Sequence, residues 1–349
     1  MILYNHGMAP MMIIGKWGNV LDKGNIKLLP TVTVAMAVYK PNIEWFQEQL
    51  KSLDDQDYTG NLRLLVFNDS PHDFDPAPYL QQYINNFSWE VIDNGRNNGP
   101  IIAFEELTRI CETELISYCD QDDVWESNKI SQMVSFMEKN PDCTACHCDR
   151  ILIDENGREL NYERTVYKKT CNELNDVELQ KQVILTKNFM NGCAMLMKTS
   201  LVKDSLPFPR CKFHDIWLTI YNIFYGRVYC MKDKLMKHRV YGSNTSATLA
   251  GISTKDDYYK LKLDSDYEWI NFVVDRIDTY GCYDKDLQWV NVRKKYASCA
   301  NVKNLIGMLS VISIRPAIVL FEIFMPLVPS FLFNNTIKFV RFLADRGVR

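Results

Sequence analysis

Apolar runs and polar loops alternate along the first two thirds of the chain. Residues 31–39 form an apolar, β-branched run that predicts a buried strand. Ile43, Phe46 and Leu50 follow at helical spacing, and residues 63–67 repeat the strand pattern. A strand, a helix and a second strand in this order predict a crossover unit, in which the carboxyl ends of parallel strands share one edge of the sheet.

The alternation of apolar and polar segments continues to about residue 240. Gly192 interrupts one apolar run, where a glycine within a strand permits either the close approach of a ligand or a bulge. The chain therefore predicts an α/β fold whose mostly parallel central sheet is flanked by helices, with ligand sites beyond the carboxyl ends of the strands. The further predicted strands are residues 90–92, 115–119, 143–153, 189–197 and 235–241, and the further predicted helices are residues 103–111, 130–137, 213–226 and 255–280.

The two ends of the chain break this pattern. Residues 1–30 predict an extension that lacks the basic segment of a secretory signal. Residues 305–333 are strongly apolar, but Arg315, Glu322 and three prolines interrupt them, so they indicate interfacial or partner-covered helices rather than a membrane span. From Lys303 onward six basic residues outnumber two acidic ones, a net charge of +4. This segment suits docking on an anionic cytoplasmic leaflet and, equally, packing on the domain or on a second subunit.

Composition and charge narrow the function. The 349 residues carry a formal net charge of −3 and no basic stripe, which argues against a general nucleic-acid binder. Eleven cysteines are an odd number scattered over a long chain, a pattern typical of reduced cytosolic thiols rather than of a disulfide framework. The densest group, Cys143, Cys146 and Cys148, has no second pair at the spacing of a zinc site, so it indicates a core strand.

Three carboxylates within four residues follow one of the predicted strands. Asp120, Asp122 and Asp123 would repel one another unless a bound cation or a positively charged ligand offsets their charge, so they predict a Mg²⁺ or Mn²⁺ site. The alternative is a solvated turn in which an aspartate caps the next helix. Asp69 and Asn98 fall at the ends of other predicted strands, and we therefore expect them at the same edge of the sheet.

Polar loops at one sheet edge suit a nucleotide diphosphate. A carboxylate after the second strand can hydrogen-bond a base or a ribose, and the aspartate cluster can hold a divalent cation against the phosphates. The chain has neither a Gly-x-Gly-x-x-Gly motif nor a Gly-Lys-Ser/Thr phosphate loop, which disfavours dinucleotide and P-loop chemistry. A metal ion is therefore expected to meet the diphosphate.

Four ordered motifs resemble those of family 2 glycosyltransferases of the GT-A fold. They are TVAMAVY at residues 33–39, FNDS at 67–70, NNG at 97–99 and YCDQDDVW at 118–125. The resemblance covers roughly residues 31–247, and the later GCAM and HDIW segments are similar to the bacterial rhamnosyltransferase-like branch, which builds cell-surface polysaccharides. It implies an N-terminal extension (1–30), a GT-A catalytic domain (31–250) with a nucleotide-sugar half (31–125) and an acceptor half (126–250), and a C-terminal helical region (251–349) that is open to membrane association.

The resemblance implies roles for residues on the nucleotide side. Val38 and Tyr39 would line the nucleotide pocket, and Asp69 would meet the base. The loop that contains Asn98 and Gly99 would flank the same side. All five residues are expected at the ends of predicted strands.

The resemblance also implies a separate role for each aspartate of the cluster. Asp120 would lie near the ribose, Asp122 would ligate Mg²⁺ or Mn²⁺ on the donor diphosphate, and Asp123 would support the metal site. The metal would offset the charge that grows on the departing nucleoside diphosphate, which is where electrostatic stabilisation acts most.

On the acceptor side the resemblance points to a general base. Asp215 matches the position of that base, and it would take the proton of the acceptor hydroxyl while the oxygen attacks the anomeric carbon from the opposite face. The residues alone favour a helix N-cap for Asp215, and the family pattern reverses that preference. His214 would orient the base or simply pack, and Gly192 and Trp217 belong to the same acceptor-side motifs.

One segment departs from the family pattern. The related enzymes have a Tyr-Arg-x-His-Gly stretch, whereas this chain has His238, Arg239 and Tyr241 in an order that exchanges the aromatic residue and the histidine. Tyr241 is a poor ligand for Mg²⁺ at neutral pH. Arg239 would clamp the diphosphate as a fixed positive charge, or else lie solvated on the surface.

These inferences together predict an inverting, metal-dependent hexosyltransferase. It would move a sugar, with rhamnose as one candidate, from a dTDP- or UDP-sugar to a hydroxyl of a growing cell-surface polysaccharide or a lipid-linked glycan. We expect a cytoplasmic protein that contacts the inner face of the cell membrane peripherally, and a homo-oligomer stays open. One alternative is a non-catalytic sugar-nucleotide-binding partner subunit. Another is a haloacid-dehalogenase-type phosphatase with Asp120 as nucleophile, although three predicted strands precede that residue.

Overall fold

The computed structural model describes residues 2–4, 20–22, 25–160, 175–176, 190–241, 251–277 and 283–345. Most of the predicted extension over residues 1–30 lies outside these ranges. The chain divides into two compact units, Met1–Val240 and Tyr241–Arg349.

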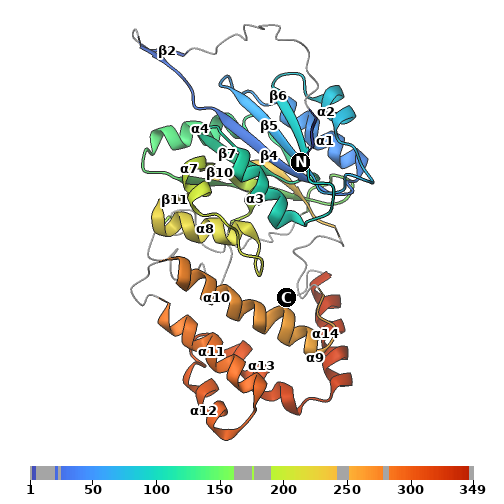
Figure 1. The fold of residues 1–349 in the computed structure, drawn as a ribbon, viewed down its shortest axis with the longest axis vertical. Helices are drawn as coiled ribbons and strands as arrows, with labels where there is room; N and C mark the ends of the chain where they lie inside the picture. Colours follow the sequence, from blue (N-terminus) through green and yellow to red (C-terminus); the bar gives the residue numbers. More distant parts are fainter. Residues whose placement is uncertain are drawn as a thin grey trace. The chain divides into compact units, whose positions relative to one another are not determined.

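A nine-stranded sheet forms the centre of the first unit within the described residues (Figure 1). Its strands are β1 (Ile2–Tyr4), β4 (Val32–Val38), β5 (Leu62–Asn68), β6 (Ser88–Asp93), β7 (Leu115–Cys119), β8 (Val124–Trp125), β9 (Ala145–Ile153), β10 (Met195–Lys198) and β11 (Val228–Arg239). Their order is β1-β6-β5-β4-β7-β10-β9-β11-β8. Strands β6, β5, β4 and β7 are parallel, whereas β10 runs antiparallel to both β7 and β9. A separate hairpin pairs β2 (Val20–Asp22) with β3 (Asn25–Lys27).

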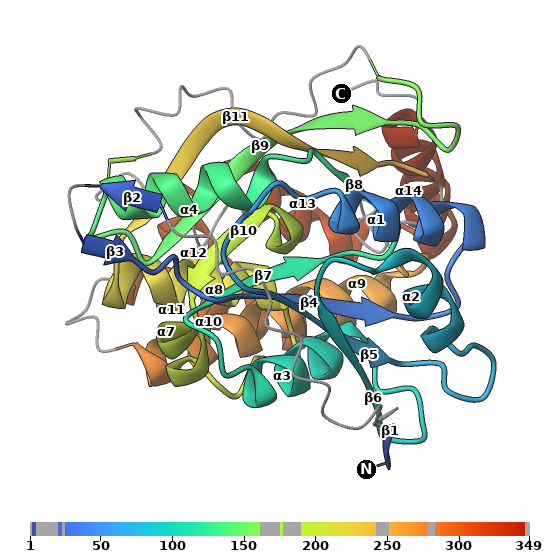
Figure 2. The ribbon, with the colours of Figure 1, turned by 90° about the horizontal axis from the view of Figure 1, so that it is seen from above.

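Helices cover both faces of the parallel strands. Figure 2 shows α1 and α4 on one side of β4 and β7, and α3 on the other. Strand β4 is accordingly buried almost throughout, which explains its continuous apolar sequence. The helices of the first unit are α1 (Ile43–Asp54), α2 (Ala77–Tyr83), α3 (Pro100–Ile110), α4 (Lys129–Lys139), α7 (Thr199–Asp204) and α8 (His214–Tyr225).

The structure confirms the predicted α/β fold with a central sheet flanked by helices, and parallel pairings join β6, β5, β4 and β7 and join β9 to β11, whereas the other four pairings are antiparallel. Two predicted bounds were wrong. The run at 189–197 was expected to be a strand, but its described part begins as a 3-10 turn, η1 (Gly192–Ala194), and only Met195–Lys198 pairs as β10. Strand β11 begins at Val228, earlier than expected, because its first residues pair in parallel with β9.

The second unit is helical. Its elements are α9 (Lys255–Tyr258), the π-helix η2 (Tyr259–Asp264), α10 (Ser265–Arg276), α11 (Asp284–Ser298), α12 (Val302–Ser310), α13 (Pro316–Phe324), η3 (Met325–Leu327) and α14 (Ser330–Asp345). Buried Arg293 joins three of these helices, because its guanidinium bonds Glu322 at 2.6 and 2.8 Å and Asp266 at 3.1 Å. Among the residues described, no helix combines the length and the apolar character needed to cross a membrane.

Candidate active site

The aspartate turn follows β7 at the carboxyl edge of the parallel strands. β8 pairs antiparallel with β11, and its register sets Val124 beside Lys237. Because His238 and Arg239 follow Lys237 directly, this pairing brings them to the aspartate turn, more than a hundred residues away in the sequence. The side chains of two distant segments therefore meet at this edge.

Four side chains converge at the turn. Within the part of the chain that the structure describes, the potential ligand atoms of Asp120, Asp123, Cys193 and His238 lie within 4.8 Å of one another. Asp123 is fully buried, and its Oδ1 accepts hydrogen bonds from His238 Nδ1 at 2.9 Å and from the Arg239 amide at 3.1 Å. Its other oxygen, Oδ2, is buried without a hydrogen-bond partner. Such an orphaned carboxylate oxygen is costly unless a cation or a proton meets it.

Burial and charge shift the titration of this cluster. Burial, followed by repulsion from Asp123 and Asp122, raises the pKa of Asp120 to about 7. Burial would also raise the pKa of Asp123, but His238 and the Arg239 amide lower it overall. Burial would lower the pKa of His238, yet Asp123 raises it overall, so the two residues form an ion pair.

The donor set fits a hard divalent cation. Carboxylates and imidazole are ligands that Mn²⁺ accepts, and carboxylates suit Mg²⁺ as well. A cation here would also offset the repulsion that raises the pKa of Asp120. The Cys193 thiol suits these ions poorly, because burial, aided by the nearby carboxylates of Asp120 and Asp123, raises its pKa well above the usual range and keeps it neutral.

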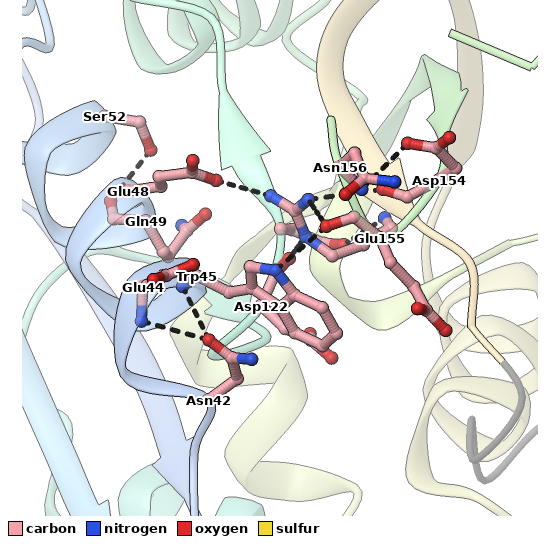
Figure 3. Close-up of polar contacts among 12 residues, drawn as sticks. Asn42, Glu44, Trp45, Glu48, Gln49, Ser52, Asp122, Asp154, Glu155 and Asn156 are labelled. Atoms are coloured by element: carbon pink, nitrogen blue, oxygen red, sulfur yellow. Dashed lines mark hydrogen bonds and ion pairs between the residues drawn. The ribbon is translucent and has the colours of Figure 1, made fainter. Parts of the chain in front are cut away.

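The Arg239 side chain contacts the aspartate turn, and its partners Glu48, Asp122, Asp154 and Glu155 are labelled in Figure 3. Its guanidinium is 1% exposed and donates from Nε to the Asp122 carbonyl at 3.0 Å. One terminal nitrogen bonds Glu48 of α1 at 2.6 Å, and the other reaches the carbonyls of Asp154 and Glu155 at 3.2 and 3.3 Å. The group also lies over the Trp45 ring, 5.0 Å from its centroid. These contacts contradict a solvated surface arginine, and they indicate a residue that positions the turn.

Hydrogen bonds from backbone amides link the predicted nucleotide-side residues. Asp69 is 3% exposed, and its two carboxylate oxygens accept the amides of Asn98 at 2.6 Å and Gly99 at 2.9 Å. The Asp69 amide donates to the Val38 carbonyl at 2.7 Å. Gly99 has φ of 82°, a conformation that favours glycine. Asp69 therefore fixes the Asn98 loop against the end of β4.

Tyr39 is connected to the aspartate turn by Gln121. The side-chain amide of Gln121 accepts from the Tyr39 amide at 2.8 Å and donates to the Tyr39 carbonyl at 3.0 Å. The Tyr39 side chain itself is 46% exposed. The structure thus brings the nucleotide-side residues and the aspartates to one continuous edge.

Asp215 lies in the first turn of α8, but it does not cap that helix. The N-cap residue is Phe213, which has no side-chain cap. The Oδ1 of Asp215 accepts its neighbour's amide, that of Ile216, at 2.7 Å. A Cβ atom on Gly192 would come within 3.5 Å of the Asp215 Cβ and 3.1 Å of His214 Nε2. Glycine at position 192 therefore permits α8 to approach η1, whose next residue is Cys193 of the cluster.

His214 and Trp217 serve packing. His214 is 9% exposed among aromatic rings, with centroid distances of 4.4 Å to Phe104 and 5.2 Å to Tyr118. Burial lowers its pKa to about 3, so the imidazole is neutral. Trp217 is fully buried and donates from Nε1 to the Ser205 carbonyl at 2.8 Å. Both side chains fix α8, and through it they place Asp215.

Several residues of the site were missed in the sequence. Cys193 was noted only within an apolar run and the GCAM segment, and Lys129 was not singled out. Lys129 is fully buried, where its Nζ donates to the Cys193 carbonyl at 2.6 Å and lies 3.3 Å from the centroid of the Trp125 ring. Nothing in the sequence indicated that Lys129, a lysine at the start of a helix, would be buried. The position of Gln121 between two aspartates was the one available hint of its bridging role.

The sequence has recognisable relatives. The family described as Glycosyl transferase family 2 matches residues 33–205. An uncharacterized glycosyltransferase of Rickettsia conorii is 24% identical over 226 residues, which are 63% of this chain and 35% of that protein. An uncharacterized protein of Mycobacterium tuberculosis is 20% identical over 169 residues, 47% of this chain and 46% of that protein. The chain spans less than half the length of these curated relatives.

Solved structures share the fold. S. aureus TarS in complex with UDP-GlcNAc has a TM-score of 0.55 at 17% identity, covering 83% of this chain and 82% of that one. The complex of the same protein with UDP has a TM-score of 0.53 at 17% identity, with the same coverage. This likeness confirms the mixed α/β architecture of the GT-A fold.

Proposed function

Because residues 33–205 belong to glycosyl transferase family 2 and the chain has the GT-A fold, we propose that it is an inverting, metal-dependent glycosyltransferase. It would move a sugar from a nucleotide diphosphate donor to an acceptor hydroxyl. The observation that carries this proposal is the cluster of half-buried Asp120, buried Asp123 and half-buried His238 at the carboxyl edge of the sheet, where the Oδ2 of Asp123 lacks a partner.

The metal site would draw on the aspartate turn. A Mg²⁺ or Mn²⁺ ion there would supply positive charge against the departing nucleoside diphosphate. Asp120 and Asp123 would hold it from the buried side, and Asp122, which lies partly exposed on the same turn, is the ligand that the family resemblance implies. His238 keeps Asp123 ionised, and Arg239 keeps the turn in place through the Asp122 carbonyl.

The nucleotide would lie along the edge formed by Val38, Tyr39, Asp69 and the Asn98–Gly99 loop. The hydrogen bonds that join these residues support a preformed wall. The complexes of TarS contain UDP-GlcNAc and UDP, which favours a nucleotide-sugar donor, and we propose a UDP- or dTDP-sugar with rhamnose as a candidate.

Asp215 is the proposed general base. In this role it takes the proton of the acceptor hydroxyl, and the hydroxyl oxygen forms its bond to the anomeric carbon as the bond to the diphosphate breaks. A single displacement inverts that carbon. Asp215 suits the role because it is partly exposed, does not cap α8 and is placed by buried His214 and Trp217. The proposed acceptor is a growing cell-surface polysaccharide or a lipid-linked glycan at the inner face of the membrane.

A non-catalytic sugar-nucleotide-binding subunit is the second candidate. The reason for considering it is Tyr241, a poor metal ligand that stands where the family has a histidine. Tyr241 is also the first residue of the second unit. His238 answers that objection, because the β8–β11 pairing supplies an imidazole to the cluster from another position. A phosphatase is disfavoured further, because β7 follows β4, β5 and β6 in the chain.

A thermal-shift panel tests the proposal. UDP, dTDP and GDP would each be added with and without Mn²⁺, because a ligand at 100 times its Kd stabilises the folded state by about 2.7 kcal/mol. We expect one nucleotide to raise Tm only with Mn²⁺, and we expect Asp122→Ala to lose that shift. If none of the three raises Tm in the presence of Mn²⁺, the proposed donor site is wrong.

A further inference from the structure

The end of the second unit exposes a run of large apolar side chains. Nine of them between residues 302 and 332 are at least 38% exposed, and Leu327 reaches 78%. Monomeric soluble proteins rarely expose so many in one segment, and such surfaces usually mark an interaction site. They are Val302, Ile306, Leu309, Leu320, Phe321, Phe324, Leu327, Phe331 and Leu332, which together we call the α12–α14 surface.

The exposure follows helical geometry. On α12 the exposed apolar positions are 302, 306 and 309, while Met308 faces inward and is fully buried. On α13 the exposed positions are 320, 321 and 324, while Val319 and Glu322 are buried. Each helix thus buries one side within the unit and turns a second apolar side outward. Figure 1 draws α12 and the first turn of α14 toward the same end of the helical unit.

The exposed charges within residues 302–338 have one sign. Between residues 302 and 338 the sequence has a single acidic residue, Glu322, and that side chain is buried against Arg293. The exposed charged residues in this described segment are Lys303 and Lys338. An apolar segment whose own exposed charges are cations is complementary to an anionic lipid leaflet, in which side chains enter the acyl boundary and lysines meet phosphates.

We propose that the α12–α14 surface docks the chain on an anionic membrane leaflet. The helices are too short to cross the bilayer, so they would lie in its interface. A second copy fits this surface less well. An isologous contact through this segment would gather Lys303 and Lys338 of both copies, and the segment itself has no exposed carboxylate to pair them. Delivery of the active site to lipid-linked acceptors rests on the proposed glycosyl transfer, whereas vesicle docking itself does not.

Flotation with vesicles tests the docking. The full chain would be mixed either with phosphatidylcholine vesicles or with vesicles that contain roughly 30% phosphatidylglycerol. No sugar donor and no sugar acceptor would be added. We expect binding to the anionic vesicles that weakens as salt is raised. The double variant Leu327→Ser and Phe331→Ser should lose at least about tenfold in partitioning, since each side chain gives up its burial in lipid. Replacing both Lys303 and Lys338 by Glu should cost at least about 25-fold on anionic vesicles, because each lost lysine costs roughly fivefold and each new carboxylate adds repulsion.

The matched control replaces exposed apolar residues of the first unit. Leu28 is 68% and Tyr225 is 47% exposed, and changing both to Ser should leave vesicle binding unchanged. Circular dichroism would establish that each variant is folded. The proposal is overturned if the wild type does not float with anionic vesicles, or if the Leu327 and Phe331 variant floats equally well. It is also overturned if light scattering shows an oligomer that this variant dissociates. If no nucleotide raises Tm but the protein still floats with anionic vesicles, the glycosyltransferase proposal is rejected and the docking proposal stands.

Discussion

Arg239→Met tests whether this arginine positions the aspartate turn. Methionine keeps the unbranched stem but removes the guanidinium, and with it every donor and the contact over the Trp45 ring. The lost hydrogen bonds to the Asp154 and Glu155 carbonyls, at 3.2 and 3.3 Å, cost little because these groups lie near the surface and water can replace the arginine. The bond to the Asp122 carbonyl is the costlier loss, since a hydrogen bond from a charged donor contributes about 1.5–3 kcal/mol.

The ion pair with Glu48 adds little, because the Glu48 side chain is 53% exposed. We therefore expect Arg239→Met to destabilise the first unit by about 3 kcal/mol, measured by urea unfolding followed by circular dichroism. Glu48→Gln removes only the ion pair and is the matched control, with an expected loss below about 1 kcal/mol. The freed turn should also bind Mn²⁺ and UDP about tenfold more weakly, equal to ~1.4 kcal/mol. An Arg239→Met protein as stable as the Glu48→Gln protein would refute this account.

Three further predictions concern other parts of the chain. Asp215→Asn should keep nucleotide binding and lower sugar transfer by about 10²- to 10⁴-fold, as measured by nucleoside diphosphate release; near-normal transfer would reject the base. Glu322→Gln should destabilise the helical unit by about 3 kcal/mol, because it leaves buried Arg293 short of a counter-charge; an unchanged urea midpoint would contradict this. Burial raises the pKa of Glu105, but Arg210 and Arg109 lower it overall below the ordinary 4.5. The stability that the ionised Glu105 contributes is therefore fully present above pH 4.5, and it is lost as the pH falls through the lower pKa of the folded protein. The difference in unfolding free energy between wild type and Glu105→Gln should accordingly shrink in acid.

Much of the fold could be predicted because local pattern and tertiary structure agree. β4 was visible as an apolar, β-branched run since both of its faces are covered. Helix α1 was visible because Phe46 and Leu50 repeat at helical spacing and both are fully buried. The 189–197 run misled because its apolar residues fill the core from a 3-10 turn, and hydrophobic periodicity does not distinguish that turn from a strand.

The site could be predicted as a cluster but not in its internal order. The position of Asp120 and Asp123 after a strand could be predicted, since polar residues at a strand end are a feature of the local sequence. The pairing of Asp123 with His238 was not, because it depends on the register of β8 against β11, set far along the chain. The same register buries Arg239, which the sequence alone offered as a phosphate clamp or a surface residue.

Electron paramagnetic resonance of Mn²⁺ tests the central claim most directly. Free Mn²⁺ gives a six-line signal that weakens on binding, so a titration with protein and UDP or dTDP counts occupied sites. The account predicts loss of the free signal at one ion per chain only when a nucleotide is present, and recovery of that signal in a variant with Asp120→Asn and Asp122→Ala. A free signal that the wild type leaves unchanged with either nucleotide would contradict it.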